Sequence, residues 1–153
     1  MSKIDKLRES VPFLRNFSDK DMAMFLTFIK PVSKPAGYLL YSKGDTPDNF
    51  HVIISGEIEI YLDISSSTET RKKVITTLKS GDLVGDMGFA LRGEKTFGNR
   101  TAHARTTTDV ILFEISMQTI QQRKDLNTII YQNLSRVLAM KLVETNKLVT
   151  KVK

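Results

Sequence analysis

Two short segments hold residues whose types and spacing suit the recognition of a phosphorylated ligand. The first is Gly81–Leu91, in which three glycines are interspersed with acidic and apolar residues, and the second is Asn99–Ala102. Glycine lets the backbone approach a ligand closely, and the amides that open a helix attract anions. Arg100 offers a planar fork that matches two phosphate oxygens, and the Asp86 carboxylate can accept hydrogen bonds from a ribose hydroxyl. We therefore expect a phosphate site built from these two segments.

A β-rich middle region must position both segments. Between Lys30 and Ile115, short runs of β-branched and aromatic residues alternate with turn residues. Strands at this pitch, with no long helices between them, predict an antiparallel sandwich or roll. The candidate strands are Tyr38–Tyr41, Phe50–Ile54, Glu57–Leu62, Lys73–Leu78, Thr101–Arg105 and Val110–Ile115.

Helical patterns flank this region on both sides. Leu7–Ile29 has apolar residues near helical spacing, and Ser18 followed by Asp19 and Asp21 predicts the start of a second helix. After Ile115, Ser116 is placed to cap a short helix, and a wide apolar stripe follows. We expect one part of this stripe to cover the roll and the other to pair with a second chain, giving a homodimer. The stripe consists of Leu126, Ile130, Leu134, Val137, Leu138, Leu142, Leu148 and Val149.

Composition narrows the function classes. The 153 residues suit one domain, and their formal charge of +6 favours anionic partners. The chain has no cysteine, which excludes disulfides and thiolate chemistry and fits a reducing cytoplasm. No apolar run reaches membrane-spanning length, and the N-terminus lacks a signal-peptide core. We expect a cytoplasmic protein with no membrane segment.

Several short motifs, taken in their order along the chain, together resemble the cyclic nucleotide-binding domain family of catabolite activators, protein-kinase regulatory subunits and cyclic-nucleotide-gated channels. Val84-Gly85-Asp86, Phe89-Ala90-Leu91 and Arg100-Thr101-Ala102 occupy the places of its phosphate-binding cassette. Lys43-Gly44-Asp45 and Ile54-Ser55-Gly56-Glu57-Ile58 resemble its early turns. The resemblance implies an α+β fold: an antiparallel, jelly-roll-like β-roll (a double-stranded β-helix) flanked by N-terminal helices and a long C-terminal helix.

The resemblance also implies a role for each matched residue. Arg100 would bind the cyclic phosphate with help from Thr101, and Asp86 would bind the ribose 2′-hydroxyl. The amides from Gly85 to Phe89 would line the phosphate and sugar, and Met87 would help to wall the pocket. The implied ligand set is Val84, Gly85, Asp86, Met87, Gly88, Phe89, Arg100, Thr101 and Ala102, with Thr145 and Asn146 of the C-terminal helix over the purine.

Two departures from the family pattern bear on the site. The family's acid is normally glutamate, so Asp86 is one methylene shorter. The spacing from Asp86 to Arg100 is also longer than usual, and the surplus resembles an insertion at Thr96-Phe97-Gly98-Asn99. A longer loop is entropically cheap, so the fold should survive. Arg100 could nevertheless be displaced, in which case Lys95 could share the phosphate.

Together these observations predict a single regulatory domain over residues 1–153, with helices at 1–29, a roll at 30–115 containing a cassette at 81–102, and helices at 116–153. It would bind cAMP in preference to cGMP and convert occupancy into a movement of the C-terminal helices. It would have no catalytic residues, metal or cofactor. The chain ends near the long helix, so we expect no nucleic-acid partner here and an effector domain, if there is one, outside this chain.

Two alternatives stay open. One is a degenerate module of the same fold that dimerises or binds a partner without a nucleotide. The other is a cupin-type enzyme, because cupins share the roll. A cupin metal site needs a His-x-His pair with further ligands, whereas His51 and His103 each stand alone in the sequence.

Overall fold

The computed structural model describes the backbone of residues 1–152 and the side chains of residues 1–148, which fall into two units. The β unit runs from Ile29 to Met117, and the helical unit consists of Met1–Phe28 and the chain from Gln118 onward. These boundaries lie close to the predicted ones at 30 and 115. That the whole chain acts as one domain stays a prediction. None of the described helices combines the length and apolarity that a bilayer crossing requires.

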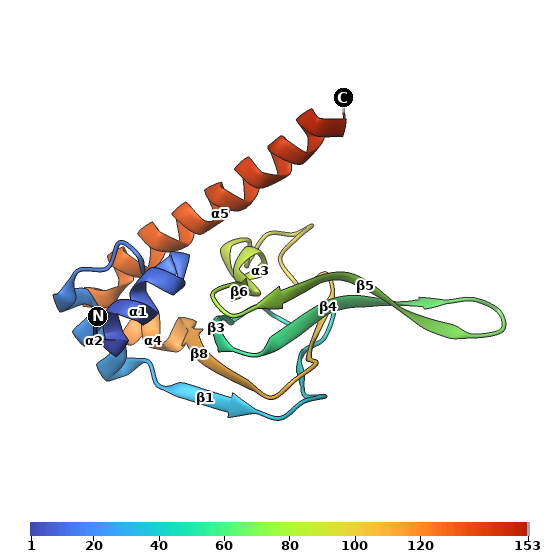
Figure 1. The fold of residues 1–153 in the computed structure, drawn as a ribbon. Coiled ribbons are helices and arrows are strands. Elements are labelled where there is room, and N and C mark those ends of the chain that lie inside the picture. The colour runs from blue at the N-terminus through green and yellow to red at the C-terminus, as the bar shows by residue number, and fades with distance from the viewer. Residues whose placement is uncertain (153) are drawn as a thin grey trace. The chain divides into compact units, whose positions relative to one another are not determined.

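Two antiparallel four-stranded sheets form the β unit (Figure 1), which confirms the predicted fold class. The order is β1-β8-β3-β6 in the first sheet and β2-β7-β4-β5 in the second. A short helix, α3 (Asp86–Ala90), follows β6. The strands are β1 (Pro31–Lys34), β2 (Leu39–Tyr41), β3 (Asn49–Ser55), β4 (Glu57–Ser65), β5 (Thr70–Lys79), β6 (Leu83–Val84), β7 (His103–Thr106) and β8 (Val110–Ser116).

Both sheets contribute to one apolar core. On the first sheet, Ile53 and Leu112 lie opposite each other. On the second sheet, Ile58 and Ala104 lie on the neighbouring strands β4 and β7. All four side chains are buried in the same cluster. Tyr41 is only partly buried and packs against this cluster. The core therefore extends toward the end of β2, where the turn Ser42–Asp45 begins.

The hairpin of β4 and β5 is longer than the sequence predicted. Expected ends at Leu62 and Lys73 become Ser65 and Thr70, and the turn closes with a bond from the Ser66 amide to the Glu69 carbonyl. Strand β7 pairs with β4 from Ile58 to Tyr61, so the ribbon beyond is a two-stranded extension (Figure 1). Nearly all of β5 is exposed. Its polar sequence therefore lacks the alternation that marks a half-buried strand.

The helical unit is built around aromatic packing. It contains α1 (Lys3–Ser10), the 3₁₀ turn η1 (Pro12–Leu14), α2 (Asp19–Phe28), most of α4 (Met117–Gln122) and α5 (Lys124–Val152). The rings of Phe13, Phe17 and Phe25 lie 5.5–6.5 Å apart between centroids. Both η1 and α2 contact α5, whose residues Leu126, Ile130 and Leu134 are buried. The apolar stripe predicted on this helix therefore serves the core in its first half.

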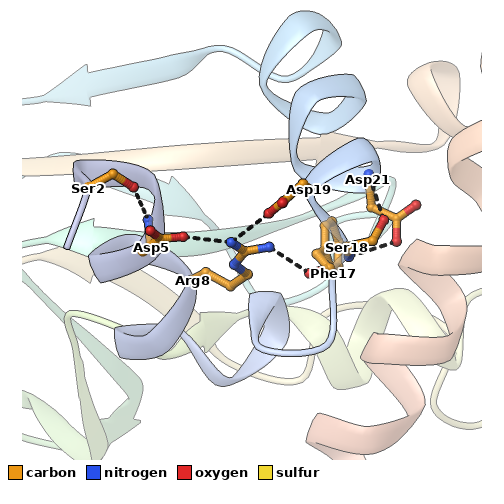
Figure 2. A network of polar contacts seen from close by, with 7 residues as sticks. All are labelled: Ser2, Asp5, Arg8, Phe17, Ser18, Asp19 and Asp21. Carbon is orange, nitrogen blue, oxygen red and sulfur yellow. Dashed lines mark hydrogen bonds and ion pairs between the residues drawn. The ribbon is translucent and has the colours of Figure 1, made fainter.

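Polar contacts fix the start of α2 and join it to α1 (Figure 2). The Ser18 hydroxyl accepts from the Asp21 amide and the Asp21 carboxylate accepts from the Ser18 amide, both at 3.0 Å. This reciprocal pair is the predicted N-cap. Arg8 bridges Asp5 at 2.7 Å and Asp19 at 2.9 Å, and it also donates to the Phe17 carbonyl. These contacts tie α1 to the loop before α2.

Candidate functional site

The site begins where β6 turns into α3. Gly85 lies between them with a φ of 77°, in the left-handed region that favours glycine. A side chain here would also meet Arg100, because a Cβ built on Gly85 lies 2.5 Å from Nη1 of Arg100. A Cβ on Gly88 would lie 3.0 Å from the same atom. The glycines predicted to admit a ligand thus admit the arginine that would bind it.

Arg100 is buried, with 5% of its surface exposed, and three groups of the β unit hold it. Its Nη1 donates to the Gly85 carbonyl at 2.6 Å. Its Nη2 donates to the Asn49 carbonyl at 2.5 Å and lies 3.3 Å from the Asn49 side-chain oxygen. The guanidinium carbon lies 4.2 Å from the centroid of the Tyr41 ring. Nε is also buried, and no acceptor for it is found among the described residues.

The long spacing before Arg100 does not displace it from Gly85. Backbone bonds anchor Arg100 to the turn after β2: the Gly44 amide donates to the Arg100 carbonyl at 2.7 Å, and the Arg100 amide donates to the Asp45 carbonyl at 2.8 Å. The surplus residues form a loop in which Gly98 packs so closely that a Cβ would lie 2.1 Å from the Glu94 carbonyl oxygen. The loop therefore absorbs the insertion. Lys95 is exposed within it.

Burial dominates the electrostatics of the site. It lowers the pKa of Arg100, while Asp45 and Asp86 act in the opposite direction. The group remains a cation at neutral pH because arginine is not deprotonated in proteins. Burial also raises the pKa of Tyr41, so its hydroxyl is neutral at physiological pH. A fixed cation and a neutral ring thus lie side by side.

A polar network continues from Arg100 along the first sheet. The Asn49 side-chain amide donates to Glu114 at 3.0 Å, and the same carboxylate oxygen lies 3.8 Å from Nε2 of His51. His51 and Glu114 are direct partners in the register of β3 and β8. Burial, with smaller effects from Arg100 and Lys34, lowers the pKa of His51 to about 4. His51 is therefore neutral at pH 7.

The remaining cassette residues divide into buried and exposed groups. Val84 and Phe89 are fully buried, and the Phe89 ring packs 5.0 Å from that of Phe50. These two residues support α3 from the core. Asp86 is also buried, with 3% of its surface exposed. Ala102 is buried, whereas Met87 is 58% exposed and Thr101 is exposed. Ligand contacts for these residues stay predictions.

Thr145 and Asn146 belong to the other unit. Both are exposed on α5, and the Thr145 hydroxyl donates back to the Lys141 carbonyl at 3.0 Å. Their predicted place over the purine is a contact of the ligand-bound protein and stays a prediction.

The two histidines occupy different surroundings. His51 faces Glu114, whereas Nδ1 of His103 accepts from the Lys43 amide at 3.1 Å and its Nε2 lies 3.4 Å from Asp63. Within the part of the chain that the structure describes, no three histidine, aspartate or glutamate side chains are grouped as metal ligands would be.

Comparison with known proteins decides the family. The model of the cyclic nucleotide-binding domain matches residues 31–125. The chain belongs to the cyclic nucleotide-binding domain family. The match spans both sheets, the α3 segment and Arg100, but not Thr145 or Asn146. The family resemblance inferred from the motifs is therefore confirmed.

Proteins similar to this chain are found both by sequence and by structure. A CRP-like cAMP-activated global transcriptional regulator of Mycobacterium tuberculosis is 26% identical over 118 residues, covering 77% of this chain and 49% of the regulator. A cyclic nucleotide-binding domain from Methylobacillus flagellatus superimposes with a TM-score of 0.74 at 16% identity, covering 98% of this chain and 84% of that one. The c-di-GMP-responsive regulator CLP of Xanthomonas campestris gives a TM-score of 0.60 at 25% identity, covering 88% and 64%.

The curated relatives are longer than this chain. It spans 49% of the length of the Mycobacterium regulator and 64% of that of the Haemophilus influenzae regulator. What the longer relatives do as whole proteins is a separate matter from what this domain does.

Two residues of the site were missed by the sequence analysis. Tyr41 was predicted as the end of a strand, and Asn49 lies just before a predicted strand, so neither was assigned a ligand-related position. Both reach Arg100 through the fold, across 59 and 51 positions of sequence. No local pattern signals such contacts. The glycines and the arginine were found because their types alone suit an anion site.

Proposed function

We propose that this domain is a sensor for a cyclic mononucleotide, with cAMP preferred over cGMP. Arg100 binds the cyclic phosphate, the backbone from Gly85 to Phe89 lines the phosphate and sugar, and Asp86 accepts from the ribose 2′-hydroxyl. The observation that carries the proposal is the Arg100 guanidinium, held in a buried position against Gly85 and Gly88. A buried arginine guanidinium can bind an anion through two parallel hydrogen bonds, as to the two free oxygens of a cyclic phosphate.

The preference for cAMP rests on two arguments. The sequence relatives with significant similarity include several cAMP-activated regulators by name. Thr101 follows Arg100, and its hydroxyl needs no particular base orientation to add a phosphate hydrogen bond. A single hydroxyl contact contributes about 0.5–1.5 kcal/mol. Both nucleotides should therefore bind within about tenfold of each other.

The same proposal includes the helices. Thr145 and Asn146 contact the purine in the bound state, and α5 changes its arrangement when the ligand binds. A ligand shifts such an equilibrium only by its difference in affinity for the two arrangements. Alanine substitution of Thr145 and Asn146 should therefore weaken nucleotide binding and reduce any ligand-dependent change in α5.

Calorimetric titration tests the proposal directly. The parent protein is titrated with cAMP, cGMP and c-di-GMP, and so are Arg100→Ala and the control Arg105→Ala, an exposed arginine of β7. We expect Arg100→Ala to weaken cAMP binding by about 2–4 kcal/mol, the scale for losing one partner of a buried charge-assisted pair. Arg105→Ala should bind like the parent. Equal titration curves for Arg100→Ala and the parent would show that Arg100 does not bind the cyclic phosphate.

A second candidate function is an interaction module that binds no nucleotide. The observation that favours it concerns Arg100, which already donates to the Gly85 and Asn49 carbonyls. Part of the hydrogen-bonding capacity of Arg100 is therefore used within the protein, without a ligand. Absence of heat with all three nucleotides, together with self-association of the chain, would select this alternative. Tight binding of c-di-GMP alone would instead replace the mononucleotide with a dinucleotide.

A further inference from the structure

Tyr41 packs directly against the side chain of Arg100. It is the last residue of β2, directly before the turn Ser42–Asp45 that holds the Arg100 backbone. The guanidinium carbon of Arg100 lies over the Tyr41 ring, 4.2 Å from the ring centroid. An arginine cation at this distance from an aromatic ring is attracted by the negative face of the ring. Backbone and side chain of Arg100 are thus fixed from the same short stretch of chain.

We infer that Tyr41 is a positioning residue, which sets the plane of the Arg100 guanidinium and thereby the edge that it presents to a phosphate. The inference deepens the proposed function and rests on it for the ligand. The fixed plane itself is a property of the protein alone. Tyr41 is not expected to exchange protons or to bind the phosphate as its main ligand.

The donors of Arg100 show which edge is available. Nη1 is committed to the Gly85 carbonyl and Nη2 to the Asn49 carbonyl, both with short bonds. The contact from Nη2 to the Asn49 side-chain oxygen is longer, at 3.3 Å, and Nε has no acceptor among the described residues. Nε and Nη2 point to the same side of a guanidinium and form a two-donor edge. A phosphate that takes this edge pairs with Nε, which must first become accessible because it is buried in the ligand-free protein, and it replaces only the weak side-chain contact of Asn49.

A purely apolar role for Tyr41 is the alternative. Its ring also packs against the core cluster of the two sheets, so a large aliphatic side chain could fill the same volume. The two roles differ in what they require. Packing needs volume, whereas positioning needs an aromatic face beside the cation. The hydroxyl is neutral because burial raises the pKa of Tyr41, so it adds no charge that either role would need.

Three variants separate these roles. Tyr41→Leu keeps an apolar side chain and removes the ring, and Tyr41→Phe keeps the ring and removes the hydroxyl. Tyr38→Leu is the matched control, because the exposed Tyr38 ring lies under Lys34 at 4.6 Å, away from Arg100. Thermal unfolding of each variant shows whether the fold is kept.

The first measurement needs no ligand. The order parameter of the Arg100 Nε–H bond, from ¹⁵N relaxation of the signal that is lost in Arg100→Lys, reports how rigidly the guanidinium is held. We expect Tyr41→Phe and Tyr38→Leu to keep the order parameter of the parent and Tyr41→Leu to lower it. An unchanged order parameter in folded Tyr41→Leu would overturn the inference, whatever the protein binds.

The second measurement is titration with cAMP and with cGMP. We expect Tyr41→Leu to bind roughly threefold to thirtyfold more weakly than the parent, the range for a cation–π contact in a partly desolvated site. Tyr41→Phe should bind within about twofold of the parent. If the parent binds and folded Tyr41→Leu binds equally well, Tyr41 does not position the phosphate ligand. If the parent binds neither nucleotide, the proposed function fails, and the order parameter of Arg100 alone decides whether Tyr41 sets the guanidinium plane.

Discussion

At Gly85, two separate requirements exclude a side chain. The φ of 77° strains any residue with a Cβ, and the Cβ would also lie 2.5 Å from Nη1 of Arg100. Gly37 has a similar φ of 80° but no atom within 4 Å of a built Cβ. The two positions thus share the backbone strain and differ in the contact with Arg100.

We therefore expect Gly85→Ala to do more damage than Gly37→Ala. The left-handed conformation costs roughly 1–2 kcal/mol in both variants, and Gly85→Ala must also push the guanidinium away. Urea unfolding and cAMP titration of the two variants measure the difference. If both variants lose the same stability and bind alike, the contact between Gly85 and Arg100 has no energetic consequence.

His51 carries a second prediction at the residue scale. Its folded pKa of about 4 lies below the ordinary 6.5, so the unfolded chain binds a proton that the folded protein does not bind. Stability from this group is fully present above pH 6.5 and is lost as the pH falls toward 4. The loss is about 3 kcal/mol for a shift of this size. The Glu114 carboxylate, 3.8 Å from Nε2 of His51, is 44% exposed and screened by water.

The measurement is the free energy of unfolding from pH 7 to pH 4. We expect His51→Leu to flatten the dependence on pH in this window. An equal slope in His51→Leu and the parent would show that other groups cause the acid sensitivity.

How far the sequence predicts this site depends on the residue. Gly85 and Arg100 were identified because an anion site needs backbone freedom and a planar cation, and both needs are visible in residue type. The contacts of Arg100 with Tyr41 and Asn49 depend on β2 and β3 being brought beside the cassette by the sheets. Such contacts are set by topology, which a local pattern does not encode.

At the scale of elements, the helix start predicted at Ser18 is found in the structure. Its hydroxyl and the Asp21 carboxylate satisfy each other's backbone amides at the start of α2. Replacing an N-cap serine by alanine costs about 1 kcal/mol, and we expect that loss in Ser18→Ala by urea unfolding. Ser135→Ala is the control, because the Ser135 hydroxyl only donates back to the Tyr131 carbonyl within α5. A larger loss in the control would contradict a capping role for Ser18.

The strands were less completely predicted than the helix starts. Strands β1 and β6 were missed because they are short, with four and two residues, and are defined by pairing with β8 and β3. The ends of β4 and β5 were missed because exposed polar residues show no alternation. Burial creates the pattern that sequence analysis uses, so elements with little burial escape it.

At the scale of the whole molecule, the apolar residues of α5 are buried in its first half and exposed in its second half. Residues up to Val137 are buried on one face, whereas Met140, Leu142, Val143 and Leu148 are 46–64% exposed. Val149, also predicted in the stripe, has a side chain outside the described residues. Of the four exposed residues, Leu142 and Leu148 continue the stripe of Leu134 and Leu138, and an apolar helix face of this kind is suited to pairing with a second copy of the same helix. The predicted homodimer therefore has a specific candidate surface.

Charge placed on that face should dissociate the dimer. Leu142 continues the stripe of Leu134 and Leu138, whereas Met140 is two residues earlier and so about 200° around the helix. Leu142→Glu and Met140→Glu each add one carboxylate at an exposed apolar position of the same helix. They therefore have similar costs in helix propensity.

We expect light scattering to report a dimer for the parent and Met140→Glu and a monomer for Leu142→Glu, because a desolvated carboxylate is unfavourable at a helix interface. A monomeric parent at high concentration, with and without cAMP, would rule out the dimer. Equal dissociation of both variants would rule out this face as its interface.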